Sequence, residues 1–206
     1  MLLNGVFLEQ TVQLPISNWS IGQKSHGHKV TSDVNHLVDV IRQTVKGKNL
    51  SLLDVGCGNG IVAIMLSLLE NSWRIVGIDI QKELVELAQR NSKQCKVEID
   101  FLVGDIRYFK FDNKFDIIVS NPPYFPENIG RIPRSSQRAI SRFELTLTMN
   151  NLISFIKKNL DETGTSFVMY PHWRLKELKK TVESNKLTLE SVSKLKKSFV
   201  GVLKKV

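Results

Sequence analysis

A glycine-rich turn between a predicted strand and a predicted helix constrains the fold of this chain more than any other feature. Residues 50–55 form a compact apolar run, and the sequence Gly56-Cys57-Gly58-Asn59-Gly60 follows it directly. Residues 61–69 are again largely apolar and predict a helix. Glycine lets the backbone take positive φ angles and approach a ligand closely. In a doubly wound α/β sheet this first turn lies at the carboxyl ends of the strands, where ligands bind.

The rest of the chain alternates short apolar runs with amphipathic stretches, which predicts an α/β fold with a mostly parallel, doubly wound sheet covered by helices on both faces. Residues 161–164 predict a turn. We expect strands at 74–79, 98–103, 115–120 and 165–170, a closing strand pair at 187–195 and 199–206, and helices at 82–92, 141–159 and 174–185.

Residues 1–48 stand outside this alternation. Residues 14–29 are polar and irregular, and Ser32 or Asp33 can N-cap a helix that runs through about residue 45. Too few residues are present here for an independent core. We therefore expect an N-terminal lid or flank at 1–48, followed by one domain at 49–206.

The composition excludes several classes of protein. With 42% hydrophobic and 24% charged residues the chain is in the globular range. No apolar run reaches the roughly 20 residues of a membrane-spanning helix, and residues 1–10 do not resemble a secretory signal. Two cysteines are too few for a disulfide framework, and three histidines (His26, His28 and His36) lack the carboxylate or cysteine partners of a metal site. We expect a cytoplasmic protein, a monomer or weak dimer, without a metal or a membrane partner.

The glycine turn differs from that of dinucleotide-binding proteins. Those have G-x-G-x-x-G, whereas this chain has G-x-G-x-G with Asp54 two residues before Gly56. This pattern resembles motif I of class I S-adenosylmethionine (SAM)-dependent methyltransferases. The resemblance implies a Rossmann-like fold whose seven-stranded sheet has an antiparallel C-terminal strand, with SAM as cofactor. It also implies that Asp54, Gly56, Gly58 and Gly60 contribute to the cofactor site.

Two more acidic residues follow predicted strands. Asp79 ends the second strand, where a carboxylate can accept hydrogen bonds from both hydroxyls of a ribose. Asp105 follows the third strand, at the position where this methyltransferase class contacts the adenine of its cofactor. We therefore add Asp79, Ile80, Asp105 and Ile106 to the predicted cofactor site.

The sequence Asn121-Pro122-Pro123-Tyr124 directly follows the strand predicted at 115–120. Two prolines fix the backbone and leave carbonyl acceptors, the Asn side chain adds another acceptor, and the Tyr ring offers a stacking surface. The sequence resembles the N/D-P-P-Y/F/W motif of methyltransferases that act on adenine N6, cytosine N4 or glutamine. We predict these four residues as catalytic, with Asn121 also near the cofactor and a flipped-out base stacked on Tyr124.

Two other segments resemble one family within this class, the bacterial tRNA1(Val) (adenine-N6)-methyltransferases, which modify the base next to the anticodon. These are residues 23–33 and residues 138–144. The resemblance implies tRNA as the partner. Alternatives are an adenine in rRNA or DNA, a glutamine of a translation release factor, and a non-catalytic RNA-binding protein. The release-factor enzymes have a longer helical N-terminal domain than 48 residues can supply.

The net charge of +9 is concentrated in two segments. Residues 174–206 hold ten Lys or Arg residues against three Glu, and residues 131–142 hold four Arg residues and no acidic residue. Basic clusters neutralise the phosphates of nucleic acids. We predict contacts to substrate from the basic side chains of Lys29, Arg131, Arg134, Arg138 and Arg142.

Overall fold

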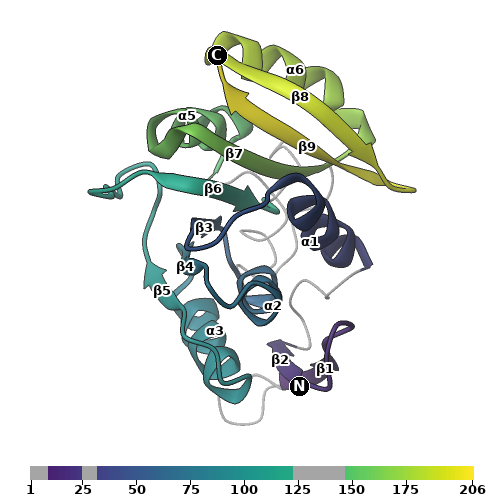
Figure 1. Ribbon diagram of the computed structural model, residues 1–206, viewed down its shortest axis with the longest axis vertical. Helices are drawn as coiled ribbons and strands as arrows, with labels where there is room; N and C mark the ends of the chain where they lie inside the picture. The colour runs from purple at the N-terminus through teal and green to yellow at the C-terminus, as the bar shows by residue number, and fades with distance from the viewer. Residues whose placement is uncertain (1–8, 25–31, 123–146) are drawn as a thin grey trace, which may run out of the picture.

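The computed structural model describes residues 9–24, 32–122 and 147–206. A seven-stranded sheet forms the middle layer, between two layers of helices (Figure 1). Its strand order is β5-β4-β3-β6-β7-β9-β8, and every neighbouring pair is parallel except the two that involve β9. The predicted fold class is confirmed, including the antiparallel C-terminal strand.

The strands supply the buried middle of the molecule. Apolar runs without alternation, such as Ile117 to Val119, match strands covered on both faces. The order of strands along the sheet reverses between β3 and β6, so the carboxyl ends of these two strands define the switch point where α/β sheets bind ligands. The strands are β3 (Ser51–Val55), β4 (Arg74–Asp79), β5 (Asp100–Val103), β6 (Phe115–Ser120), β7 (Leu160–Pro171), β8 (Leu187–Lys194) and β9 (Ser198–Lys205).

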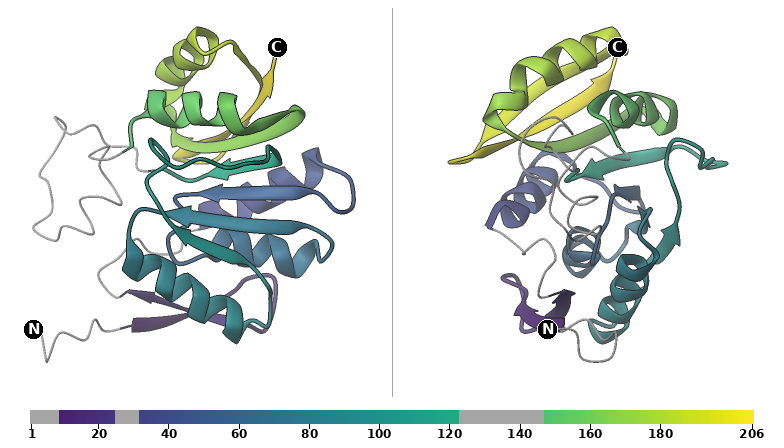
Figure 2. Two further views of the ribbon diagram at one scale, coloured as in Figure 1. Left: turned by 90° about the vertical axis from the view of Figure 1, so that its left-hand side faces the viewer. Right: turned by 180° about the vertical axis from the view of Figure 1, so that it is seen from behind.

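Helices cover both faces of the sheet (Figure 2). One hydrophobic cluster joins α1 (Ser32–Thr44), α2 (Ile61–Leu69) and α3 (Lys82–Gln94) to one face, and a second joins α5 (Met149–Asn159) and α6 (Leu175–Ser184) to the other. Helix α2 is buried at every position from Ile61 to Leu66, which explains why its sequence has no polar stripe.

The N-terminal flank contains a hairpin that the sequence did not predict. Strands β1 (Glu9–Gln13) and β2 (Ser20–Lys24) pair antiparallel, and Leu14 and Ile21 belong to the core cluster that also contains residues of α2 and α3. The Asn91 side chain of α3 holds β2 by two hydrogen bonds, because its amide oxygen accepts from the Gly22 N–H at 2.8 Å and its Nδ2 donates to the Gly22 carbonyl at 3.0 Å.

Most predicted bounds differ from the structure by no more than two residues, but two predictions differ by more. Helix α5 begins at Met149 because Thr148 forms an N-cap with Asn151, so residues 147–148 are not helical; residues 141–146 of the predicted helix lie outside the described residues. The turn predicted at 161–164 is an irregularity inside β7. Leu160 of β7 pairs with Phe115 of β6, but the next pair joins Thr165 to Ile117, so the register of the two strands shifts between them. Within the shifted stretch, Asp161 accepts a hydrogen bond from the Thr163 N–H.

Candidate functional site

The glycine turn forms the base of the site at the carboxyl end of β3. The N–H groups of Gly56 and Cys57 both donate to the Ile78 carbonyl oxygen, at 2.8 and 3.1 Å, so the turn lies against the end of β4. Gly56 and Gly58 have φ angles of 70° and 56°, and a Cβ added to either would meet no atom of the described residues within 4 Å. The turn therefore borders open space that a ligand can enter.

Gly60 has a different role in the same turn. Its φ is 83°, and an added Cβ would lie 2.8 Å from Cζ of Phe101 and 3.0 Å from Cβ of Ala88. This glycine lets α2 begin close to β5 and α3. It supports the predicted cofactor site by positioning the turn and does not face the open space.

Asp54 is a buried carboxylate beneath this turn, with 2% of its surface exposed. Within the part of the chain that the structure describes, its Oδ2 atom has no hydrogen-bond partner. Burial raises the pKa of Asp54 to about 7; a hydrogen bond with the Ala63 backbone opposes the shift, and the nearby Asp79 carboxylate adds to it. A positive charge placed at the turn would stabilise the ionised form.

Asp79 organises the turn from the end of β4. Its Oδ2 accepts the Gly58 N–H at 2.9 Å and its Oδ1 accepts the Gln81 N–H at 2.9 Å. Burial raises the pKa of Asp79, while hydrogen bonds from the backbone of Gln81, Gly58 and Ile80 act in the opposite direction. Each oxygen keeps acceptor capacity for a ribose hydroxyl. The neighbouring Ile80 side chain, 38% exposed, offers an apolar surface at the same edge.

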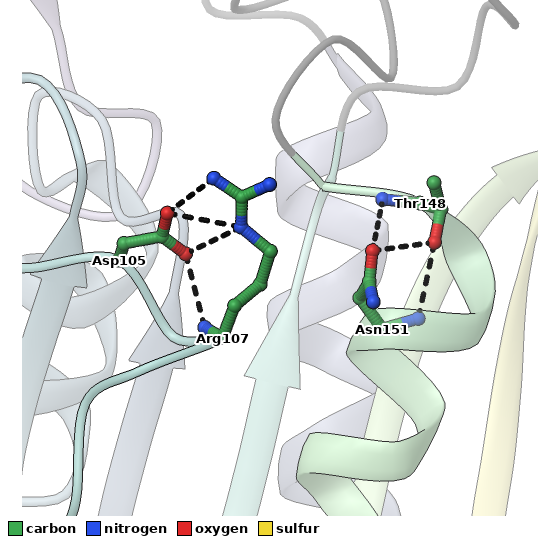
Figure 3. A network of polar contacts seen from close by, with 4 residues as sticks. All are labelled: Asp105, Arg107, Thr148 and Asn151. Atoms are coloured by element: carbon green, nitrogen blue, oxygen red, sulfur yellow. Dashed lines mark hydrogen bonds and ion pairs between the residues drawn. The ribbon is translucent and has the colours of Figure 1, made fainter.

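Asp105 is held by a residue that the sequence reasoning missed. The Arg107 Nε lies 3.0 and 2.9 Å from the two Asp105 oxygens, Nη2 lies 2.5 Å from Oδ2, and the Arg107 N–H donates to Oδ1 (Figure 3). Hydrogen bonds from the Arg107 side chain lower the pKa of Asp105. Its neighbour Ile106 packs partly buried against the second core cluster. The sequence signal for this pair was an arginine two positions after an acidic residue.

Asn121 and Pro122 follow β6 directly, at the switch point. The Ser120 hydroxyl donates to the Val55 carbonyl at 2.8 Å and thereby fixes the end of β6 to the end of β3. Asn121 is half-buried and Pro122 is buried. The structure therefore brings Asn121 to the same sheet edge as the glycine turn, Asp79 and Asp105, whereas several other predicted residues lie outside the described ones: Lys29, Pro123, Tyr124, Arg131, Arg134, Arg138 and Arg142.

The start of α5 lies near Asp105 and Arg107, on the opposite side of the strand that Figure 3 shows between them. Thr148 Oγ1 accepts the Asn151 N–H at 3.2 Å, and the Thr148 N–H donates to Asn151 Oδ1 at 3.3 Å. This capping box is the second feature of the site's surroundings that the sequence reasoning missed. It gives α5 a defined start at Met149.

Among the described residues, the remaining reactive side chains give no competing site. Cys57 and Cys95 are buried, and burial raises the pKa of the Cys57 thiol well above its usual value, so neither is an accessible thiolate. Over residues 9–24, 32–122 and 147–206, no group of three His, Cys, Asp or Glu side chains is arranged to hold a metal ion. None of the helices described there is long and apolar enough to cross a membrane.

The residues present fit the cofactor that the sequence predicts. SAM carries an ammonium and a sulfonium. Negative charge at the turn comes from Asp79 and from Asp54, whose Oδ2 has no hydrogen-bond partner among the described residues. The open space in front of Gly56 and Gly58 provides room for a ligand close to the backbone. Asp54, Gly56, Gly58, Asp79, Ile80 and Asp105 therefore form one candidate cofactor site at the carboxyl ends of β3, β4 and β5.

The seven-stranded sheet and this site define an α/β methyltransferase. A family model described as a methyltransferase domain matches residues 46–204, and the chain belongs to that family. Among solved structures, the 16S rRNA N2 G1207 methyltransferase of T. thermophilus, in complex with AdoMet and guanosine, superimposes with a TM-score of 0.72 at 16% identity. The match covers 100% of this chain and 52% of that one. It supports the fold.

Two curated relatives carry different names. A tRNA1(Val) (adenine(37)-N6)-methyltransferase from Glaesserella parasuis serovar 5 is 36% identical over an alignment of 119 residues, and the match covers 51% of this chain and 50% of that protein. A release factor glutamine methyltransferase from Lactococcus lactis subsp. lactis is 36% identical over 92 residues, 45% of this chain and 34% of that protein. The chain thus spans a third to a half of the length of these relatives. The predicted resemblance to the tRNA methyltransferase family is confirmed.

Proposed function

We propose that this protein transfers a methyl group from SAM to the exocyclic N6 amine of an adenine in tRNA, at the base next to the anticodon. One observation carries the proposal: Asn121 and Pro122 follow β6 at the switch point, beside the glycine turn of β3. The relative named as a tRNA (adenine-N6)-methyltransferase supports the choice of acceptor.

The chemistry follows from what these residues can accept. SAM, when bound, supplies a methyl group activated by the positive charge of its sulfonium. An adenine amine is a poor nucleophile because its lone pair is delocalised into the ring. The Asn121 side-chain oxygen and the Pro122 carbonyl are acceptors for its two hydrogens, and accepting both lets the nitrogen pyramidalise. Catalysis then rests on positioning and electrostatics, with Pro123 holding the turn and Tyr124 stacking on the flipped base.

The cofactor-binding part of the proposal rests on the charged and open features of the turn. Asp54 and Asp79 provide the negative charge, and the glycines Gly56, Gly58 and Gly60 shape the backbone around the ligand. Asp105 and Ile106 are proposed to border its adenine. Lys29 and the arginines at 131, 134, 138 and 142 are proposed to contact the tRNA backbone.

A release-factor glutamine is the second candidate acceptor. A relative of that name matches this chain at the same 36% identity as the tRNA methyltransferase relative. A second relative named tRNA1(Val) (adenine(37)-N6)-methyltransferase aligns over 141 residues and covers 68% of this chain, against 45% and 56% for two relatives named release factor glutamine methyltransferase, and this favours tRNA.

The proposal is tested by incubating the protein with labelled SAM and total tRNA, ribosomal RNA or release factor, followed by digestion and identification of the methylated product. N6-methyladenosine from tRNA is the expected product, whereas methylglutamine would overturn the choice of tRNA. Asn121→Ala is expected to retain SAM binding in calorimetry and to lose transfer. Asn121→Asp, which keeps a side-chain acceptor, is the matched control and should retain part of the activity.

A further inference from the structure

The turn between β8 and β9 presents three lysines in one tight loop. Lys194, Lys196 and Lys197 are all exposed, and the Leu195 N–H donates to the Ser198 carbonyl at 2.8 Å to close the turn. We call these three residues the hairpin lysines. The sequence placed them in a general basic segment but gave no reason to separate them from the other lysines of residues 174–206.

The hairpin lysines lie at the same edge of the sheet as the candidate site. Strand β9 is antiparallel to β7, and Ser198 pairs with Pro171, so β9 begins where β7 ends. Since β7 is parallel to β6, this is also the edge at which Asn121 follows β6. Only β7 separates β6 from β9 in the sheet, and neighbouring strands lie about 4.8 Å apart. Figure 1 shows the turn at the end of the hairpin away from the C-terminus.

Several contacts hold the turn in place. The Nε2 atom of the His172 ring lies 2.7 Å from the Leu195 carbonyl oxygen, and the ring stacks on Phe199. The backbone N–H of His172 donates to the Lys197 carbonyl at 3.3 Å. On the other side, the Ser198 hydroxyl donates to Asp33 at the start of α1, at 2.8 Å. The backbone of the turn is therefore fixed to two other elements, which makes the three charges a defined surface.

An exposed aromatic side chain follows β7 at this edge. Trp173 is 52% exposed, and the guanidinium carbon of the buried Arg174 lies 5.4 Å from the centre of its ring. Arg174 also lies over Tyr170 and pairs with Glu177 at 2.8 Å. Trp173 is thus held by a fixed cation while half of its surface is exposed to solvent. Lysines beside an aromatic ring are the combination that binds single-stranded nucleic acid.

Other lysines of the C-terminal segment are placed differently. Lys204 pairs with Glu190 at 3.0 Å, and Lys205 pairs with Glu162 at 2.9 Å, both toward the opposite edge of the sheet. Lys179 and Lys180 lie exposed along α6, and Lys186 precedes β8 at that opposite edge. Within the part of the chain that the structure describes, no ion pair engages the hairpin lysines.

We propose that the hairpin lysines and Trp173 form a docking surface for RNA at the carboxyl edge of the sheet, where they hold the substrate backbone while the target base enters the site at Asn121. The proposal rests on the proposed function in taking RNA as the substrate. The lysines neutralise backbone phosphates and release counterions, and Trp173 stacks on an unpaired base.

The test compares two triple variants of the full chain that remove the same charge. Lys194→Ala/Lys196→Ala/Lys197→Ala removes the hairpin lysines, and Lys179→Ala/Lys180→Ala/Lys186→Ala is the matched control. The dissociation constant for deproteinised total tRNA is measured by fluorescence anisotropy over a series of salt concentrations. SAM affinity by calorimetry and thermal unfolding show that each variant is folded.

We expect the hairpin variant to bind tRNA at least tenfold more weakly, with its log–log salt slope reduced by about 2 to 3. The control variant should change affinity less than twofold, and both should bind SAM as the unaltered chain does. Trp173→Ala should weaken binding without changing the salt slope, because stacking releases few counterions.

Equal losses in the two triple variants, or no loss in the hairpin variant, would overturn the proposed surface while leaving tRNA methylation intact. Failure of the unaltered chain to bind or methylate tRNA, with methylation of release factor instead, would overturn the proposed function and the docking surface with it. The two failures are distinguished by the methylation assay on the unaltered chain.

Discussion

The substitution Asp54→Asn tests the electrostatics of the glycine turn. Burial raises the pKa of Asp54 from 3.8 to about 7 in the folded chain. The folded state therefore binds a proton that the unfolded state releases between about pH 4 and pH 7. Stability must fall as the pH rises through this range, because the unfolded state holds fewer protons there. The asparagine variant carries no such proton and should lack this part of the pH dependence.

The size of the effect follows from the two pKa values of Asp54. One pKa unit corresponds to about 1.4 kcal/mol. At pH 5 the ionisable carboxyl destabilises the folded state by roughly 2 kcal/mol, and at pH 8 by roughly 4 kcal/mol. The free energy of unfolding of the variant, relative to that of the unaltered chain, should thus be about 2 to 3 kcal/mol more favourable to the folded state at pH 8 than at pH 5. Any constant cost of the buried amide cancels in this difference.

The assay is urea denaturation of both proteins without cofactor at pH 5 and pH 8. For an m-value near 2 kcal/mol/M, the difference in midpoints should change by about 1 M. Asp112→Asn, at an exposed position, is the control for the loss of one charge and should show little change. A constant difference between Asp54→Asn and the unaltered chain at both pH values would refute the reasoning, because it would mean that Asp54 ionises normally in its buried position.

Four further outcomes are expected. Gly58→Ala should cost about 1 kcal/mol, because the φ of 56° is unfavourable for alanine, and should weaken SAM binding in calorimetry because the new methyl group enters the open space. Gly60→Ala should cost about 1–3 kcal/mol in chemical denaturation through overlap with Phe101, and Gly60→Ala/Phe101→Leu should recover part of it. Ser120→Ala should lose about 1 kcal/mol with its hydrogen bond to Val55. Binding of tRNA should weaken steeply with salt while SAM binding changes little, as titrations at several salt concentrations would show.

Much of the sheet could be predicted because its strands are short apolar runs bounded by glycine, acidic or polar residues. The bounds of α2, β4 and β6 agree residue for residue with the expected ranges 61–69, 74–79 and 115–120. In each case the local pattern and the tertiary structure favour the same conformation. The glycine turn and the acids at strand ends were predictable for the same reason, since their positions follow from the strand bounds.

The Asp105–Arg107 pair and the Thr148–Asn151 capping box are local patterns that the sequence reasoning missed, whereas the other missed features depend on contacts distant in the sequence. The strands of the β1–β2 hairpin, Glu9–Gln13 and Ser20–Lys24, are mostly polar and have little strand signal. Their stability comes from burial of Leu14 and Ile21 and from Asn91, which lies 69 residues beyond Gly22. The same holds for the hairpin lysines, whose position at the site edge follows only from the antiparallel pairing of β9 with β7.

At the carboxyl edge of the sheet, buried acidic residues and exposed lysines lie at different strands, so that each position favours a different kind of ligand. Asp54 and Asp79 are buried carboxylates at the ends of β3 and β4, and both have raised pKa values because burial penalises their charge. A cationic ligand relieves that penalty, and a phosphate would increase it. The hairpin lysines lie on the far side of β6 and β7, at the surface, where they attract a polyanion. A small cation is therefore favoured at the β3–β4 side and a nucleic acid backbone at the β7–β9 side, and Asn121 follows β6 between the two.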